Sequence, residues 1–150
     1  MAEVSKDIIQ KLRLKTGVSV MTVKKALEKA GGDMKKAEEF LKEEAAILAS
    51  KKSERETKAG VVQAYVHGGR IGVLVKIRCE TDFVAKNSEF QDFSREIAMQ
   101  IAASSAENTE ELLKEPYIRD ASLSVADFLK KAVGKFGENI EISAFKKLEL

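Results

Sequence analysis

Cysteine and histidine, which often act as nucleophiles, bases or metal ligands, occur only once each in this 150-residue chain. Cys79, the only cysteine, lies within a strand-like run and has no evident histidine partner, so a nucleophilic role is not expected. His67, the only histidine, precedes two glycines and is expected at the surface rather than on a metal, which would need several ligands together. The run 68–70 is too short for a phosphate-binding loop. Since the acidic residues are scattered, the sequence predicts no catalytic residue, no metal site and no cofactor.

The stretch from Cys79 to Asn87 is the strongest candidate for a binding surface. It joins an apolar strand-like run to a region with helical spacing, and junctions of this kind lie on the surface of a rigid scaffold. At its centre an aromatic residue, Phe83, follows a carboxylate, Asp82. Such an aromatic side chain either anchors its loop in the core or fills a pocket on a partner, and both alternatives are open at this point. If the side chain fills a pocket on a partner, Phe83 and Val84 form an apolar wedge, while Thr81 caps the turn.

Three motifs of the chain, in this order, resemble the signature sequences of the translation elongation factor Ts family. They are TGVSVMTVKKAL at 16–27 with AGGD at 30–33, CETDFVAKN at 79–87, and FGENI at 136–140. The first motif departs from the usual pattern, with Ser19 in place of a second glycine and Val23 where a cysteine is frequent. Long members carry a second, degenerate copy of the core module. This chain has room for one copy, so it resembles a short form with part of the middle trimmed.

The resemblance implies a guanine-nucleotide exchange factor of translation, which is not an enzyme. Its partner would be elongation factor Tu carrying GDP, and the loop would intrude beside the magnesium ion and the phosphates of that GTPase. By the match of the motif, Asp82 and Phe83 of this chain would disturb the magnesium and phosphate site of the GTPase, while Thr81 and Val84 would shape the loop.

Residues 1–44 are expected to form a small domain of three short helices. The expected N-caps are Ser5, Ser19 and Asp33. The apolar stripe expected on the second helix is Val20, Val23, Leu27 and Ala30. Three short helices with a glycine-containing first turn resemble the ubiquitin-associated fold, which the family resemblance also implies. In this domain the resemblance assigns a docking role to Arg13 and Met21.

The helical domain leaves a second function open. A ubiquitin-associated-like module joined to an α+β interaction domain would suit a protein-binding adaptor without exchange activity. The match of all three motifs, and the loop in particular, favours the exchange factor.

Residues 45–59 predict a helical extension that ends in a charged, solvated linker. Residues 60–150 predict an α+β core domain, responsible for exchange and dimerisation. Within it the runs 60–67 and 70–79 form a hairpin about two glycines, and 139–150 supplies a third antiparallel strand. Two helices, with caps at Ser88 and Ser124, are expected to cover one face of this sheet. A short helix is expected to start at Thr109.

Alternation along the strands predicts which side chains face the core. The inward set expected on the last strand is Ile140, Ile142, Ala144 and Leu148. The outward set expected on the whole sheet includes Val61, Tyr65, Leu74 and Phe145. A sheet with apolar residues on both faces seeks a partner, so we expect a homodimer through the sheet; the alternative is that the linker or the loop at Pro116 covers these residues.

Composition limits the remaining classes of protein. Apolar residues make up 44% of the chain and charged residues 33%, as in globular proteins. The net charge of +2 gives little attraction to nucleic acid, so no direct nucleic-acid partner is expected. No apolar run is long enough to span a bilayer, and a single cysteine fits a reducing compartment. We therefore expect a cytoplasmic protein of bacterial type with no membrane partner.

Overall fold

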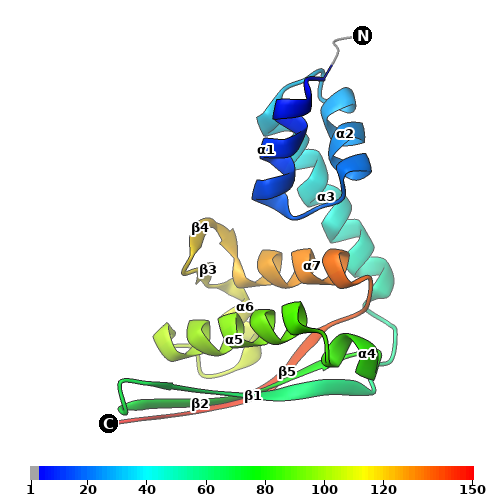
Figure 1. Ribbon diagram of the computed structural model, residues 1–150. Helices are drawn as coiled ribbons and strands as arrows, with labels where there is room; N and C mark the ends of the chain where they lie inside the picture. Colours follow the sequence, from blue (N-terminus) through cyan, green and yellow to red (C-terminus); the bar gives the residue numbers. More distant parts are fainter. Residues whose placement is uncertain (1–3) are drawn as a thin grey trace.

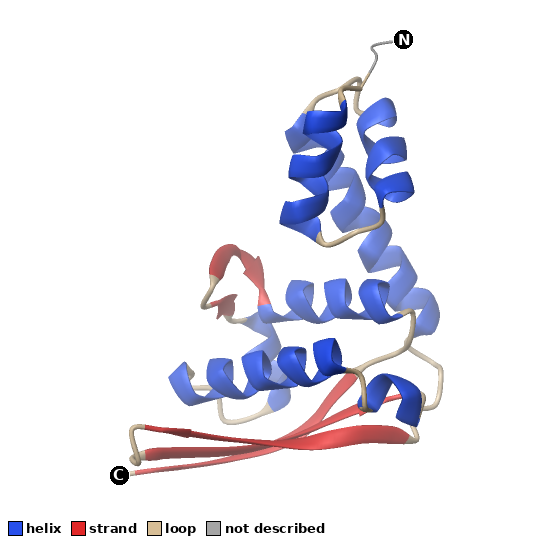
Figure 2. Cartoon of the chain, in the orientation of Figure 1, coloured by secondary structure: helices blue, strands red, loops and turns tan. Residues whose placement is uncertain are grey.

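The structure is a computed structural model that describes residues 4–150; residues 1–3, at the start of the expected domain 1–44, lie outside it. A bundle of three helices stands at one end of the molecule, and a sheet covered by helices forms the other end (Figure 1). All strands belong to the second part (Figure 2). The predicted α+β class, with a three-stranded antiparallel sheet, is confirmed.

The N-terminal bundle consists of α1 (Lys6–Thr16), α2 (Val20–Lys29) and the first part of α3 (Met34–Lys52). Ser5, Ser19 and Asp33 accept backbone hydrogen bonds in the first turns of these helices, as predicted. The buried core of the bundle is Leu12, Val23, Ala26, Leu27, Ala37 and Leu41. Val20 was expected in this core but is 43% exposed, because the first residue of α2 lies outside the packed segment.

Helix α3 runs on past residue 44, the last residue of the expected three-helix domain, into the segment expected to be a helical extension. It continues to Lys52, and only residues 53–58 connect it to the sheet. Two contacts tie it to α7 (Val125–Phe136): the Lys42 ammonium lies 3.3 Å from the Asp127 carboxylate, and Lys52 Nζ donates to the Gly137 carbonyl at 2.8 Å. A continuous helix therefore joins the bundle to the rest of the molecule (Figure 1).

The main sheet has the strand order β1-β2-β5 and is antiparallel throughout. Its strands are β1 (Ala59–His67), β2 (Ile71–Cys79) and β5 (Glu141–Glu149). Gly68 and Gly69 form the tip of the β1–β2 hairpin with φ of 57° and 66°, a conformation that glycine adopts without strain.

The helices of the core form two successive layers above one face of the sheet (Figure 1). Helix α5 (Ser88–Ala103) lies directly on the sheet, and α7 packs on the other side of α5 and against α3. Aromatic rings join α5 to α7: the centroids of Phe90 and Phe136 are 5.5 Å apart, and those of Phe93 and Phe128 are 5.2 Å apart. The expectation that both helices cover the sheet therefore holds only for α5.

The sequence predicted the N-cap of α7 correctly but not the N-cap of α5. Ser124 forms the expected cap of α7, in a capping box with Asp127. Helix α5 is capped by Asn87 rather than by Ser88, since the Asn87 side chain accepts from the N–H of Glu89 at 2.8 Å.

Short elements complete the core. They are α4 (Asp82–Ala85), α6 (Thr109–Lys114), β3 (Pro116–Tyr117) and β4 (Asp120–Ser124). The short helix at Thr109 was expected, whereas the β3–β4 hairpin was not. Buried Gln100 holds this hairpin, because its side-chain amide donates to the Pro116 carbonyl at 3.2 Å and accepts from the N–H of Ile118 at 2.9 Å.

The faces of the strands differ from expectation at one irregularity in β5. Ile77 pairs with Ile142 and Lys76 pairs with Ala144, so Ser143 is an extra residue, a β-bulge. Beyond a bulge the alternation is inverted, so Phe145 packs against the core while Ala144 and Leu148 face outward.

In strand β1, too, the side chains that were expected to point outward face the core. Val61 pairs with Ile77 and Tyr65 pairs with Val73, and all four side chains lie on the inner face. The predicted outward positions of Val61, Tyr65 and Phe145 are therefore wrong, whereas Leu74 is exposed as predicted.

Candidate functional site

The loop after β2 presents one aromatic side chain to solvent. Thr81 caps the short helix α4, since its hydroxyl accepts from the N–H of Val84 at 3.3 Å. Phe83 is 84% exposed, whereas Val84 is 6% exposed and, with Ala85, belongs to the core. Of the two open alternatives for Phe83, the core anchor is thus excluded. The expected two-residue wedge is wrong for Val84, because a four-residue helix that directs Phe83 outward turns the next side chain inward.

A carboxylate from a distant part of the chain holds the start of this loop. Glu138 Oε1 accepts from the backbone N–H groups of Glu80 and Thr81, at 3.1 and 3.0 Å. Glu138 Oε2 accepts from the Thr81 hydroxyl at 2.7 Å. In the opposite direction, Glu80 Oε1 accepts from the N–H of Asn139 at 2.8 Å. The carboxylates of Glu138 and Glu80 therefore each accept backbone N–H groups from the other residue's segment, an arrangement that we call the clasp.

Asn139 links this clasp to the segment that follows α3. Its side-chain amide, which is buried, donates to the carbonyl oxygens of Ser53 and Arg55 at 3.3 and 2.8 Å. The Arg55 guanidinium in turn lies 3.6 Å from the Glu80 carboxylate. The FGENI motif thus brings together the loop, the connection to the bundle and the start of β5.

Cys79 lies beneath the loop and is fully buried. Its thiol is directed at the Thr81 carbonyl, with Sγ 3.3 Å from the oxygen. Burial, and next the charge of Glu138, raise the pKa of this thiol above its ordinary value. A buried, protonated thiol is a poor nucleophile, so Cys79 has a structural role.

The two expected docking residues of the bundle are both exposed. Met21 is 64% exposed, and Arg13 also lies at the surface. Beside them in the sequence, Leu14 and Val20 are 79% and 43% exposed and were not singled out as surface residues. Helices α1 and α2 lie at the end of the molecule remote from α4, so the structure does not bring these residues together with Phe83 (Figure 1).

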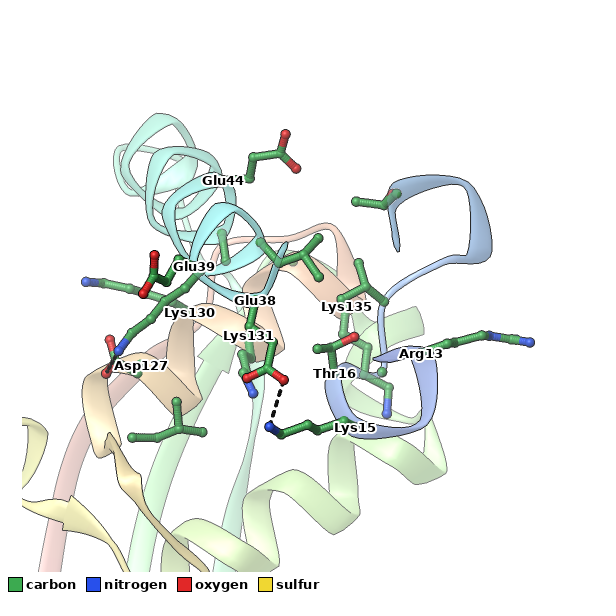
Figure 3. Close-up of a pocket in the computed structure, with 18 of the residues that line it drawn as sticks. Arg13, Lys15, Thr16, Glu38, Glu39, Glu44, Asp127, Lys130, Lys131 and Lys135 are labelled. Carbon is green, nitrogen blue, oxygen red and sulfur yellow. Dashed lines mark hydrogen bonds and ion pairs between the residues drawn. The ribbon is translucent and has the colours of Figure 1, made fainter. Parts of the chain in front are cut away.

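A cleft between the bundle and α7 lies away from the loop (Figure 3). It has a volume of about 730 Å³ and is lined mainly by long charged side chains. Several of these neutralise one another, as Lys15 and Glu38 do at 2.7 Å and Lys42 and Asp127 do at 3.3 Å. We regard this cleft as a solvated gap between two packed parts and take the loop as the candidate functional site.

The outer face of the sheet carries four large exposed apolar side chains, which we call the outer sheet patch. They are Val62, Val66, Leu74 and Leu148, which are 68%, 67%, 53% and 80% exposed. Gly72 lies between Val66 and Leu148 in the strand pairing, so no side chain separates them.

Within residues 4–150, no three His, Cys, Asp or Glu side chains are grouped as a metal site would require. No helix in the described part of the chain is both long and apolar enough to cross a membrane.

Sequence reasoning missed the role of Glu138 and Asn139. Their motif was noted only as a marker of the family, although a polar pair directly before a strand is an available signal for a loop-holding contact. The partner of Glu138 is 57 residues away in the chain, so spacing alone does not reveal it.

Comparisons with known proteins match both ends of the chain. A family model described as "Elongation factor TS" matches residues 80–150, and one described as "Elongation factor Ts, mitochondrial, N-terminal" matches residues 1–48. An elongation factor Ts from Desulforamulus reducens is 37% identical over 196 residues, which cover 100% of this chain and 90% of that protein. The elongation factor Ts of Carboxydothermus hydrogenoformans is 38% identical over 193 residues, covering 98% and 89%.

The relatives differ from this chain in length. The chain spans 46% of an elongation factor Ts from Nostoc sp., to which it is 41% identical over 146 residues, or 97% of this chain. The alignment with the Desulforamulus protein has 196 positions against 150 residues here, so at least 46 positions have no counterpart in this chain. Two relatives are matched over about nine-tenths of their length with more than a third of the residues identical. The chain belongs to the elongation factor Ts family of translation elongation factors.

Proposed function

We propose that the protein is a guanine-nucleotide exchange factor that binds elongation factor Tu carrying GDP and promotes the exchange of GDP for GTP. The observation that carries the proposal is Phe83, an aromatic side chain that is 84% exposed on a helix held at both ends. In the complex Phe83 fills a pocket on the GTPase, and Asp82, also exposed, disturbs the magnesium and phosphate site. Thr81 and Val84 give the loop its shape.

Thermodynamic linkage is sufficient for this activity. A protein that binds the nucleotide-free GTPase more tightly than the GDP-bound form must weaken GDP binding by the same factor. Displacing the groups that hold magnesium removes the cation that neutralises the phosphate charge. Since no bond to carbon or phosphorus is made or broken, the protein acts without catalytic residues and is not an enzyme.

Release of labelled GDP from purified elongation factor Tu tests the proposal. The rate of release is expected to rise with the concentration of this protein, and added magnesium is expected to oppose the effect. An adaptor that merely contains a ubiquitin-associated-like module would leave the release rate unchanged at every concentration. That result would refute the exchange function.

The bundle contributes a second contact with the same partner. Arg13 and Met21, together with Leu14 and Val20, place one cation and three apolar side chains at the exposed surface where α1 ends and α2 begins. This surface is suited to docking because an apolar centre supplies affinity and a charge fixes orientation.

A homodimer through the outer sheet patch is part of the proposal. Four large apolar side chains on one face of a three-stranded sheet favour burial against a second copy, which would also supply the second core module of long family members. Lys76, paired with Val62, and Lys146, paired with Leu74, lie on the same face, so their long side chains must carry the ammonium groups to solvent at the rim of the interface.

Sedimentation equilibrium at micromolar concentrations tests the dimer. The unaltered chain is expected to sediment with twice its monomer mass, and Leu74→Glu is expected to dissociate it. Ile118→Glu is the matched control, since Ile118 is 51% exposed but lies on the β3–β4 hairpin. A monomer mass that does not change with concentration would rule the dimer out.

The proposed site of action is the bacterial cytoplasm, where elongation factor Tu works, and the proposal includes no direct contact with nucleic acid or membrane.

A further inference from the structure

We propose that Glu138 is a positioning residue for the loop, and that its carboxylate holds Phe83 in the orientation in which it engages the partner. This inference rests on the exchange function proposed above and adds a residue that does not itself touch the partner.

The hydrogen bonds of Glu138 hold the N-terminal side of the exposed pair Asp82–Phe83 directly and reach its C-terminal side only through Thr81. On the N-terminal side, Glu138 accepts from the backbone N–H groups of Glu80 and Thr81 at 3.1 and 3.0 Å. It also accepts from the Thr81 hydroxyl at 2.7 Å, and the oxygen of that hydroxyl accepts from the N–H of Val84 at 3.3 Å. A continuous chain of hydrogen bonds therefore runs from Glu138 through Thr81 to the residue after Phe83.

The geometry makes Glu138 the anchor of one end of the loop, whereas core packing anchors the other. Val84 and Ala85 are 6% and 5% exposed and fix the C-terminal end of α4. Hydrogen bonds to a carboxylate are stronger than those between neutral groups, so three of them can fix the N-terminal end, where Thr81 is itself exposed.

Phe83 depends on these anchors because it packs against little in the free protein. With 84% of the residue exposed, its direction is set by the backbone that carries it. If the loop adopts several orientations and only one is competent, the apparent affinity falls by the competent fraction. Freeing the loop to about ten orientations of similar free energy would therefore weaken engagement about tenfold.

Three substitutions separate the reach of Glu138 from its charge. Glu138→Ala removes all three hydrogen bonds, and Glu138→Asp keeps the charge but is one methylene too short to keep them. Glu138→Gln removes the charge but keeps the length, so its amide oxygen still accepts from the backbone and its amide nitrogen donates to the Thr81 oxygen. Glu141→Ala is the matched control, because Glu141 lies in the same segment and bonds to Thr57 and Asn139 rather than to the loop.

GDP release from elongation factor Tu, measured against the concentration of each full-length variant, is the first readout. The Ala and Asp variants are expected to need about ten times more protein for half-maximal release. The Gln variant and the Glu141→Ala control are expected to stay within about threefold of the unaltered chain, since an amide of equal length preserves the hydrogen bonds.

Alkylation of Cys79, the only thiol, is the second readout and does not depend on the partner. The thiol is fully buried under the loop, so it reacts only when the loop opens or the protein unfolds. In the Glu138→Ala and Glu138→Asp variants, the rate of alkylation is expected to be about tenfold higher than the rate that global unfolding alone would allow, calculated from each variant's measured free energy of unfolding. Loss of the Glu138 charge lowers the pKa of the thiol in both the Glu138→Ala and the Glu138→Gln variants. The Glu138→Gln variant therefore shows how much of the faster alkylation this change in pKa explains.

Failure of the positioning role and failure of the exchange function give different results. If the Ala and Asp variants release GDP as well as the Glu141→Ala control does, the positioning role is refuted. It is also refuted if the thiol reacts no faster than global unfolding allows, whatever happens to GDP release. If the unaltered chain does not release GDP at all, the exchange function fails, and thiol alkylation alone still decides whether Glu138 holds the loop.

Discussion

Truncating Phe83 to alanine should separate function from folding more cleanly than any other single change. A phenylalanine side chain presents roughly 200 Å² of accessible area. At 84% exposure about 170 Å² of it is available to a partner. At ~25 cal/mol per Å² its complete burial is worth at most about 4 kcal/mol, and measured central anchors cost about 2 kcal/mol or more when truncated. Phe83→Ala is therefore expected to weaken engagement of elongation factor Tu by a factor between about thirty and several hundred.

The same exposure predicts a small effect on folding. Since few contacts are lost in the free protein, the free energy of unfolding is expected to change by no more than about 0.5 kcal/mol. Urea denaturation and GDP release are measured on the same preparation, with Ile118→Ala as the control for loss of an exposed apolar side chain elsewhere. The reasoning is refuted if Phe83→Ala unfolds far more easily while its folded fraction still exchanges nucleotide at the normal rate.

Three further outcomes are expected. Gly60→Ala should destabilise the protein by ~2 kcal/mol or more in urea, because Gly60 has φ of +153° and an added Cβ would lie 2.9 Å from the Arg78 Cα. Gly134→Ala, at an exposed position with open space around it, is the control, and equal effects would contradict the argument. Burial, and then the charge and hydrogen bond of Glu96, raise the pKa of Tyr117 to about 12. The stability that protonated Tyr117 contributes is therefore fully present below the ordinary value of 10.0 and is lost as the pH rises through about 12. In an alkaline titration followed by tyrosinate absorbance, Tyr117→Phe should remove a late step, and an unchanged curve would disprove this. Residues 1–52 alone should not release GDP, and residues 53–150 should do so only at higher concentration; full activity of the helical fragment would reverse the assignment of the active loop.

Local signals in the sequence were sufficient for most of the helices, but not for the four-residue α4 or for the Asn87 cap of α5. Ser5, Ser19, Asp33 and Ser124 were correctly identified as caps, because capping depends on a few neighbouring residues. The hairpin at 68–69 was equally readable, since adjacent glycines permit the positive φ angles of a tight turn.

The faces of the strands were not readable in the same way. Strand β1 has apolar residues in both alternating sets, so the sequence does not say which set is buried. In β5 the bulge at Ser143 inverts the alternation halfway along the strand, and a serine between two apolar residues gives no sign of it. Both errors concern pairing between strands, which is decided by tertiary packing.

For the candidate site, residue types singled out the loop but left open whether Phe83 is buried, and only the resemblance to the family favoured its exposure. An aromatic residue beside a carboxylate at a strand end pointed to Phe83, whereas the inward direction of Val84 follows from the turn of α4, and that helix was not foreseen. The contact of Glu138 with the loop depends on how two distant segments meet in the folded chain, and local spacing does not predict such a contact.

The unbroken course of α3 has a consequence for how the protein leaves its partner. Because one helix runs from the bundle onto α7, where Lys42 and Lys52 secure it, the bundle surface and Phe83 would act in the proposed complex as a bivalent ligand with a stiff spacer. Once one site is bound, the second meets its target at a high effective concentration, and no loop entropy opposes it. Each contact can then be weak by itself. Release can proceed one site at a time, so tight capture of the nucleotide-free state remains compatible with rapid turnover.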